Sequence, residues 1–400
     1  MLSNENIVCV SNTTWEGFYT KSTVQILSLL AAKNKVLFVE YPFTIKDAFS
    51  AITGSGRAPY KRMLGLEKRL VLKQSTFVTP VYQLVLPPVL PVEFIKIESL
   101  YNLLFRINTF IYSRSVKKAL KKLNMNSLVC INAYNAIYGD KLVGKLGEKL
   151  HVFYCYDGND TRRYGKRADT ADESFSRKAD GIIVTSDFLA KPKLVFNNNV
   201  EVVKNGVDFG VFSKHSKSEV NSNSVRRKVG YIGSLDHRFD LETVEYTVQQ
   251  LPEYDFEFVG DLMNKSIEPQ LSKYANVTFK PPVKPDEVPA LLRKCDVGLI
   301  PYTCTEYNKN VYPLKINEYL SVGVPVVLTS FAHLPEFENI VRFTKGKEDF
   351  CSAIKQEIEA DTSEKIKHRI EFAKSNSWES RAELFGNILE KYLIHKKSNA

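Results

Sequence analysis

The stretch Val311–Ser330, VYPLKINEYLSVGVPVVLTS, predicts a helix, a turn and a buried strand in that order. Pro313 suits the first turn of the helix, where its missing N–H costs nothing. Gly323 suits a left-handed end to the helix, and the proline two residues later prevents the helix from continuing. The apolar run Val324–Leu328 is typical of a parallel strand that is covered on both faces. The stretch therefore indicates an α/β fold.

Two charged side chains lie three residues apart in this predicted helix, beside the apolar stripe of Pro313, Ile316 and Leu320. At that spacing Lys315 and Glu318 share one face of the helix. A lysine and a carboxylate in the first turns, together with the partial positive charge of the helix N-terminus, suit an anionic ligand that carries hydroxyl groups. The alternative is an ordinary amphipathic helix with an ion pair between the two.

The segment PLKINEYLSVGVPVV resembles the donor-binding signature of GT-B glycosyltransferases, in the retaining group called family 4 or glycosyl transferases group 1. The resemblance implies that Lys315 meets the diphosphate of a nucleotide sugar and that Glu318 binds its ribose. The family usually has a second glutamate eight residues earlier, which contacts the donor sugar. This chain has Asn310 at that donor-binding position, a departure that concerns the sugar contact and not the fold.

Length and composition are those of a globular protein of about two domains, with 400 residues, 44% apolar and 25% charged. No stretch approaches the roughly 20 apolar residues that span a bilayer. We also expect no signal peptide at the N-terminus. The six cysteines are scattered and form no CxxC pair, which indicates reduced thiols in a cytosolic protein rather than disulfides or a metal site.

Apolar runs of strand length alternate with helical patterns along the chain, which predicts parallel sheets with helices on both faces. Two such units in tandem resemble the GT-B fold, in which two doubly wound Rossmann-like domains face each other across a cleft. We expect an acceptor-side domain over residues 1–210, a donor domain over 225–374, and a C-terminal helix over 375–396 that crosses back to the first domain. The polar segment Ser213–Arg227 is interpreted as the linker.

Loops at the carboxyl ends of parallel strands bind ligands in such sheets, and two of them carry candidates in the first domain. Trp15 and Glu16 follow the first predicted strand and are expected on the acceptor side; the alternative is a turn that the tryptophan anchors. Asp157 follows the strand-like run HVFYC and is a candidate catalytic residue. Similar transferases have an aspartate here, and in some inverting GT-B relatives one is the general base; the alternative is that Asp157 caps the next helix.

The second domain contributes three further donor-site candidates. Gly233 follows the strand-like run KVGYI and allows a phosphate to approach the backbone closely. Arg238 is the expected cationic partner, because a guanidinium binds phosphate oxygens through two hydrogen bonds. The resemblance places the nucleotide base against the backbone near Val283. Arg238 and Lys315 would also offset the charge of the leaving diphosphate, so both are candidate catalytic residues.

Basic residues are concentrated in the first half of the chain, where residues 51–150 hold 16 Lys and Arg against 5 Asp and Glu. Residues 92–122 form a long amphipathic helical pattern that ends in a cluster of lysines. Its aromatic residues are Phe94, Tyr101, Phe105, Phe110 and Tyr112. Such a helix suits an anionic membrane surface. The alternative is a domain helix whose apolar face belongs to the core.

Together these features predict a glycosyltransferase that moves a sugar from a UDP- or GDP-sugar to a glycan or lipid-linked glycan acceptor. The resemblance implies a retaining hexosyltransferase of surface-polysaccharide synthesis. No Asp-x-Asp pair follows a strand, so we expect no metal, and no cofactor besides the nucleotide sugar. The expected location is cytoplasmic, or peripheral at the inner face of the plasma membrane. The alternatives are a GT-B nucleotide-sugar epimerase and a non-enzymatic basic protein that binds lipid or RNA, although no nucleic-acid motif is present.

Overall fold

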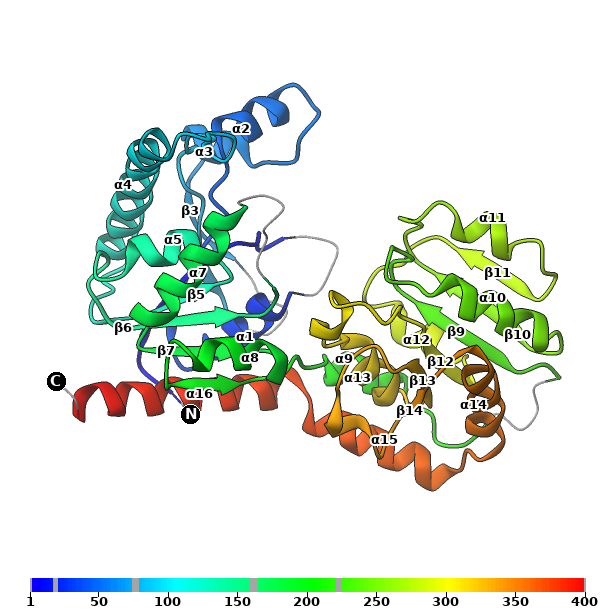
Figure 1. The fold of residues 1–400 in the computed structure, drawn as a ribbon. Helices are drawn as coiled ribbons and strands as arrows, with labels where there is room; N and C mark the ends of the chain where they lie inside the picture. The colour runs from blue at the N-terminus through cyan, green and yellow to red at the C-terminus, as the bar shows by residue number, and fades with distance from the viewer. Residues whose placement is uncertain (1, 17–20, 74–78, 159–164, 221–224, 399–400) are drawn as a thin grey trace. The chain divides into compact units, whose positions relative to one another are not determined.

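The computed structural model describes residues 2–16, 21–73, 79–158, 165–220 and 225–398. The chain divides into two units, residues 1–204 with 381–400, and residues 205–380. Each unit has its own parallel sheet, its own hydrophobic core and its own covering helices (Figure 1). The predicted α/β class with two Rossmann-like sheets is confirmed.

The first unit is built on an eight-stranded sheet in the order β3-β4-β2-β1-β5-β6-β7-β8. The strands are β1 (Asn6–Ser11), β2 (Lys35–Val39), β3 (Leu70–Lys73), β4 (Val81–Leu84), β5 (Leu128–Ala133), β6 (Glu148–Cys155), β7 (Gly181–Val184) and β8 (Val200–Val202). All neighbouring pairs are parallel except β3 and β4. The central strands β1 and β5 are buried almost throughout, as expected for a sheet that is covered on both faces.

The described helices of the first unit connect these strands or cover them. They are α1 (Ser22–Leu30), α2 (Ile45–Ile52), α3 (Tyr60–Leu64), α4 (Glu98–Lys122), α5 (Ala136–Leu142), α7 (Lys166–Lys178), α8 (Asp187–Leu194) and most of α16 (Trp378–Ser398). The main core of the unit lies between α4, α5 and one face of the sheet.

The start of α4 differs from the sequence-based prediction, because the helix begins six residues later, at Glu98. Val89 and Leu90, just before the predicted helix, are held by partners far along the chain. Val89 pairs with Thr44 in a parallel bridge. The side chain of Asn108 accepts a hydrogen bond from the N–H of Leu90 (2.8 Å) and donates one to its carbonyl (2.9 Å). Residues 92–97 themselves contain a turn, in which the N–H of Ile95 donates to the carbonyl of Val92 (3.1 Å).

The aromatic residues of α4 also differ from the prediction. Tyr101, Phe105 and Tyr112 are buried in the core, where Phe105 packs 4.9 Å from the ring of Tyr138. These three therefore cannot insert into a membrane, and their assignment to a membrane surface is wrong. Phe110 is exposed on the opposite face of the helix.

The second unit is built on a six-stranded parallel sheet in the order β11-β10-β9-β12-β13-β14. The strands are β9 (Lys228–Ile232), β10 (Asp255–Val259), β11 (Val277–Lys280), β12 (Val297–Ile300), β13 (Val326–Thr329) and β14 (Arg342–Thr344). The helices are α9 (Phe209–Phe212), α10 (Leu241–Gln250), α11 (Ile267–Leu271), α12 (Val288–Leu292), α13 (Leu314–Ser321), α14 (Lys347–Glu359) and α15 (Ser363–Ser375), with short 3₁₀ turns η1 (Ser213–His215), η2 (Asn308–Asn310) and η3 (Pro335–Phe337).

Each sheet has one point at which the strand order reverses. In the first sheet the reversal lies between β1 and β5, and in the second it lies between β9 and β12. The loops that leave these neighbouring strands diverge to opposite faces, which opens a crevice at the carboxyl edge where ligands bind in such sheets. The two reversal points are therefore where the candidate residues should be sought.

Ser216 and Lys217, in the segment interpreted as a linker, pack against the second unit. Lys217 is buried and donates a hydrogen bond to the carbonyl of Cys295, and its own N–H bonds to the carbonyl of Val322 (3.0 Å). The hydroxyl of Ser216 donates to the carbonyl of Ser321 (2.7 Å). The linker interpretation stays a prediction, and these two side chains satisfy backbone carbonyls of the second unit.

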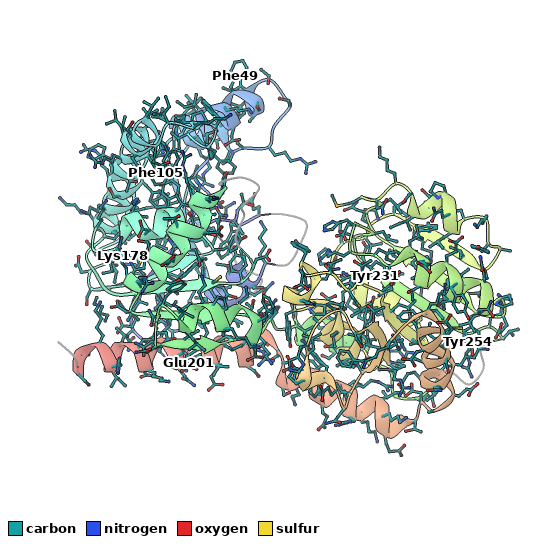
Figure 2. The ribbon with its side chains drawn as sticks, in the orientation of Figure 1. Phe49, Phe105, Lys178, Glu201, Tyr231 and Tyr254 are labelled. Carbon is teal, nitrogen blue, oxygen red and sulfur yellow. The ribbon has the colours of Figure 1, made fainter. Side chains whose placement is uncertain are left out.

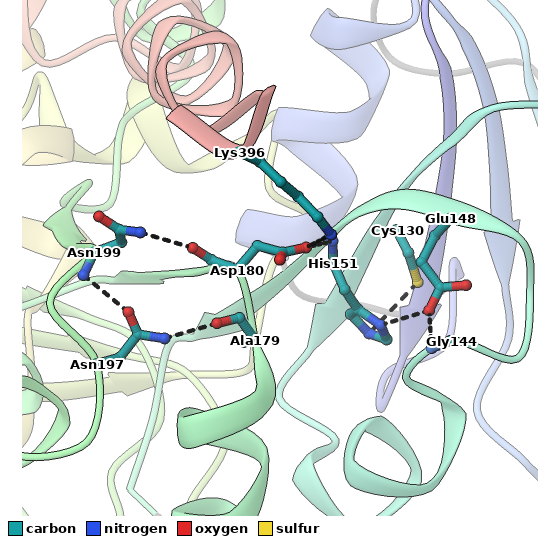
Figure 3. Close-up of polar contacts among 9 residues, drawn as sticks. All are labelled: Cys130, Gly144, Glu148, His151, Ala179, Asp180, Asn197, Asn199 and Lys396. Carbon is teal, nitrogen blue, oxygen red and sulfur yellow. Dashed lines mark hydrogen bonds and ion pairs between the residues drawn. The ribbon is translucent and has the colours of Figure 1, made fainter. Parts of the chain in front are cut away.

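The C-terminal part of α16 packs on the edge of the first sheet. The hydroxyl of Tyr392 donates to the carbonyls of Ile182 (2.9 Å) and Asn199 (3.1 Å). Its ring fills the space beside Gly181, where an added Cβ would lie 2.3 Å from the ring. Lys396 forms an ion pair with Asp180 (2.6 Å), as Figure 3 shows.

Candidate functional site

The reversal point of the second sheet brings two glycines together at the carboxyl edge. Gly233 follows β9 at φ +144°, and Gly260 follows β10 at φ +150°, values that L side chains rarely adopt. A Cβ on Gly260 would lie 2.1 Å from the carbonyl oxygen of Gly233. A Cβ on Gly233 would lie 2.2 Å from Cε of Lys315. The side chain of Lys315 therefore lies directly over the end of β9, and only glycine fits beneath it.

Lys315 presents an ammonium group whose charge is not neutralised locally. Its Nζ lies 3.4 Å from the hydroxyl of Tyr302, at the end of β12, and 5.4 Å from the centre of the Tyr231 ring. Among the described residues, no carboxylate forms an ion pair with it. Lys315 is the second residue of α13, so the positive end of the helix lies on the same side as this cation, and no described side chain caps it. The arrangement suits an anion.

Glu318 lies one turn along α13 and is half-buried. No hydrogen bond or ion pair reaches its carboxylate from the part of the chain that the structure describes. The alternative of a simple ion pair with Lys315 is therefore not what the structure shows. Burial raises the pKa of the Glu318 carboxyl above its usual value, while the charge of Lys315 opposes the rise. A carboxylate held in this way can still accept hydrogen bonds from hydroxyl groups.

Replacing Glu318 with alanine is expected to weaken nucleotide binding by about 1–3 kcal/mol, the range for a lost charge-assisted hydrogen bond. Because burial raises the pKa of Glu318, the same loss should set in on acidification at a higher pH than for an ordinary glutamate. Calorimetry with UDP measures both effects. Unchanged affinity in Glu318→Ala would exclude a contact between this carboxylate and the ribose.

Arg238 lies at the same edge but its charge is already engaged. Its Nε lies 3.0 Å from both carboxylate oxygens of Asp236, and Nη2 lies 2.5 Å from one of them. Burial acts to raise the pKa of Asp236, but the hydrogen bonds and charge of Arg238 outweigh it and lower that pKa. The guanidinium also lies 5.2 Å from the centre of the Tyr302 ring. Arg238 therefore supports Tyr302, the residue that contacts Lys315.

The remaining donor-site candidates lie on loops of the same unit. Val283 follows β11 and is partly buried against the core. Asn310 is the last residue of η2, and its side chain lies outside what the structure describes. The contact of Val283 with the nucleotide base and that of Asn310 with the donor sugar therefore stay predictions.

At the reversal point of the first sheet, Trp15 is fixed by its neighbours. Its backbone N–H donates to a carboxylate oxygen of Glu40 (2.9 Å). Its ring meets the Phe38 ring edge-on, with 5.1 Å between the ring centres. The carboxylate of Glu16 forms an ion pair with Lys73. Burial raises the pKa of Glu40, which is 3% exposed. Trp15 thus anchors the turn, as the alternative interpretation expected. Residues 17–20 lie outside the described part.

Asp157 lies just beyond β6 at the same edge, and its carboxylate is exposed. It accepts a hydrogen bond from the N–H of Gly158 (2.8 Å). Tyr134, which follows β5 at φ +55°, donates its hydroxyl to the carbonyl of Gly158. Helix α7 begins at Lys166 with Gly165 at the N-cap position, and no described side chain caps it, so Asp157 does not cap that helix. Residues 159–164 lie outside the description.

A Cys–His–carboxylate arrangement in the first unit resembles a catalytic triad but cannot act as one. The Sγ of Cys130 lies 3.6 Å from Nε2 of His151, and Nδ1 of His151 lies 3.1 Å from a carboxylate oxygen of Glu148 (Figure 3). Both Cys130 and His151 are buried. Burial raises the pKa of the Cys130 thiol well above its usual value, so no thiolate nucleophile forms.

The sequence analysis assigned no role at the second site to three of its residues, Tyr231, Tyr302 and Asp236. In the sequence, Tyr231 and Tyr302 cannot be distinguished from the other aromatic residues found in or just after apolar strands. The acid Asp236, two residues before Arg238, was a visible signal of a local ion pair. In the described residues, no cluster of three His, Cys, Asp or Glu could hold a metal ion. None of the described helices has the length and apolar character that crossing a bilayer requires.

Comparison with known proteins finds similarity to glycosyltransferases. Residues 226–360 match the family described as glycosyl transferases group 1. The putative teichuronic acid biosynthesis glycosyltransferase TuaH of Bacillus subtilis strain 168 is 30% identical over 234 residues, which make up 55% of this chain and 58% of the relative. The chain thus matches little more than half the length of that relative.

Solved structures resemble almost the whole chain at low sequence identity. Sucrose-phosphate synthase from Thermosynechococcus elongatus has a TM-score of 0.70 at 15% identity, covering 97% of this chain and 99% of the other. An alpha,alpha-trehalose 6-phosphate synthase from Burkholderia multivorans has 0.66 at 9%, covering 98% and 99%. Anabaena HepE, in complex with UDP and glucose, has 0.64 at 14%, covering 97% and 99%. At these identities the likeness concerns the fold.

The chain therefore has the GT-B fold. Its second unit matches the family described as glycosyl transferases group 1 over residues 226–360, and TuaH is a distant relative.

Proposed function

We propose that this protein transfers a sugar from a nucleotide diphosphate-sugar to a glycan or lipid-linked glycan acceptor. The observation that carries the proposal is the pairing of two unneutralised groups on α13. The ammonium of Lys315 lies over Gly233 at the point where the strand order reverses, and the open carboxylate of Glu318 follows one turn later. One group suits a diphosphate and the other a ribose.

In this proposal the second unit binds the donor and stabilises its leaving group. As the glycosidic bond breaks, negative charge grows on the diphosphate, and the ammonium of Lys315 and the N-terminus of α13 are aimed at it before reaction. Arg238 keeps the Tyr302 ring in place. The guanidinium of Arg238 binds the phosphate as well only if it does so while still paired with Asp236. Val283 serves the base, and Asn310 stands at the donor-sugar position.

The relatives support a UDP-sugar as the first donor to test. HepE is described with UDP and glucose, and several similar synthases are described as UDP-forming. TuaH supports a role in cell-wall polysaccharide synthesis. Retention of the anomeric configuration and independence from metal remain part of the proposal. So do the acceptor-side roles of Trp15 and Glu16, and a peripheral position at the inner face of the plasma membrane through residues 92–122.

The test is a thermal-shift series with UDP-, GDP-, dTDP- and ADP-sugars. A ligand at about 100 times its Kd stabilises the fold by about 2.7 kcal/mol, which is readily measured. We expect a UDP-sugar to raise the melting temperature most. If no nucleotide sugar stabilises the protein, the proposed function is wrong. Incubation with the donor alone separates the epimerase alternative, because an epimerase would change the sugar without an acceptor.

Replacing Asp157 with asparagine is expected to lower kcat by about 10- to 100-fold, or about 1.4–2.7 kcal/mol, with little change in donor affinity. The carboxylate is exposed at the carboxyl edge of the first sheet, where it can meet an acceptor hydroxyl. Steady-state kinetics and calorimetry measure the two quantities. A variant that melts much earlier but keeps its specific activity would show that Asp157 is structural.

A further inference from the structure

A cavity of about 840 Å³ lies at the outer edge of the second sheet, which we call the β14 cavity. Its walls come from β14 and the loop before it, the last turn of α14 and the first half of α15. β9, whose Tyr231 lies in the interior of the second unit (Figure 2), is three strand positions from β14, or about 14 Å. Neither Gly233 nor Lys315 nor Glu318 lines the cavity, so it is separate from the donor-site candidates.

A buried arginine forms a fixed part of the cavity wall. Arg369 is 3% exposed. Its Nε donates to the carbonyl of Gly323 (3.0 Å), and its Nη2 pairs with the carboxylate of Asp361 (2.5 Å). Gly323 directly follows the end of α13, so the arginine joins α15 to a second packed helix. The cavity is therefore built on ordered elements of the unit, and its size is in the range of about 300–1,000 Å³ that small-molecule sites have.

Basic side chains that are available to a ligand border the β14 cavity. Lys345 follows β14 and Lys365 lies in the first turn of α15, and both are exposed. Within the described part of the chain, neither ammonium has an ion-pair partner. His333 and His368 also line the cavity, and an imidazole N–H donates hydrogen bonds. Because Arg369 is already paired, the two lysines supply the positive charge that a phosphate can use.

The cavity also has carboxylates and an apolar wall. Glu338 lies in the loop before β14, and Glu357 lies in the last turn of α14. Neither carboxylate has an ion-pair or hydrogen-bond partner among the residues that the structure describes. Free carboxylate oxygens accept hydrogen bonds, so they suit hydroxyl groups. Ile340 and Phe343 are half-buried beside them and give an apolar surface on which a ring can pack.

We infer that the β14 cavity binds a small phosphorylated sugar. The lysines meet the phosphate, the two glutamates accept hydrogen bonds from the hydroxyl groups, and the apolar wall covers the carbon face of the sugar. Inorganic phosphate would use only the lysines, and a free sugar would use only the glutamates and the apolar wall. The inference goes beyond the proposed function, because it concerns a second ligand at a second place.

The test is calorimetry with glucose 1-phosphate, inorganic phosphate and glucose at constant ionic strength, since salt screens exposed charges. Wild type should bind glucose 1-phosphate about tenfold or more tightly than it binds either part alone. Lys345→Gln with Lys365→Gln should weaken the binding of glucose 1-phosphate and of phosphate by about tenfold or more. Glu338→Ala with Glu357→Ala should weaken the binding of glucose 1-phosphate but not that of phosphate. None of these four side chains is fully buried, so the variants are expected to fold.

Two controls separate the β14 cavity from other cationic groups. Lys367→Gln with Lys374→Gln removes the same charge from α15, but these lysines lie about 180–200° around the helix from Lys365 and do not line the cavity. This pair should bind glucose 1-phosphate as wild type does. Lys315→Met removes the cation of the proposed donor site and should also leave this binding unchanged.

Four results would overturn the inference. They are a wild type that does not bind glucose 1-phosphate, a wild type that binds glucose equally well, and wild-type affinity in the Lys345→Gln and Lys365→Gln variant. The fourth is loss of binding in Lys315→Met, which would place the sugar phosphate in the donor site. Calorimetry with UDP is measured in parallel, so that failure of the cavity inference and failure of donor binding are seen separately.

Discussion

Replacing Lys315 with methionine is expected to lower kcat by about 100- to 1000-fold, which corresponds to about 2.7–4 kcal/mol of transition-state stabilisation. Its ammonium has no carboxylate partner among the described residues, so its charge is available to the leaving diphosphate. Methionine keeps an unbranched stem over Gly233, where space is tightest. The measured loss therefore reports the charge and not a collapsed cavity.

The measurement is steady-state kinetics with the nucleotide sugar that gives the largest thermal shift, combined with calorimetry for UDP. The matched control is Lys347→Met, because Lys347 is a surface lysine of the same unit that pairs with Glu242 (2.9 Å). Its loss should leave kcat within about twofold, since exposed ion pairs contribute little. If Lys315→Met retains wild-type kcat and UDP affinity, the diphosphate does not lie over Gly233.

Replacing Tyr392 with alanine is expected to destabilise the first unit by about 3–5 kcal/mol, the range for removing a large buried aromatic side chain. The ring occupies the space beside Gly181, and its hydroxyl bonds to two carbonyls at the edge of the sheet. Without it α16 loses this buried contact with β7. Urea unfolding followed by fluorescence measures the effect, since Trp15 reports the first unit and Trp378 the second.

The control for this prediction is Tyr392→Phe, which keeps the ring and removes only the hydroxyl. It should cost about 1–3 kcal/mol, because the carbonyls of Ile182 and Asn199 lose a donor. The transition of the second unit should not move in either variant. Equal and small effects for Tyr392→Ala and Tyr392→Phe would show that the ring is not what holds the helix.

The sequence predicted best those elements whose residues contain their own start and stop signals. Helix α13 ends where expected, with Gly323 at φ +84°, and the apolar run after it is the buried strand β13. Local spacing also placed Lys315 and Glu318 near each other, because a helix brings residues three apart onto one face. These features depend on a few neighbouring residues, so they can be predicted without knowledge of the fold.

Helix packing and loop conformation decided the features that the sequence analysis missed. The aromatic residues of α4 alternate between core and surface according to which face lies on the sheet, and residue type alone does not reveal that choice. The charge of Arg238 is engaged because its loop turns the guanidinium onto Asp236. A loop has no period, so spacing does not predict which charges remain unpaired.

The sequence by itself determined the α/β class, the resemblance to a GT-B family, and the presence of a cation and a carboxylate on one helix. Only the tertiary structure decided that this cation lies over Gly233, far away in the chain. The physical reason is strand order: β9 and β12 are neighbours in the sheet, and α13 packs beside them. Their carboxyl ends, and the residues that follow, therefore meet at one point.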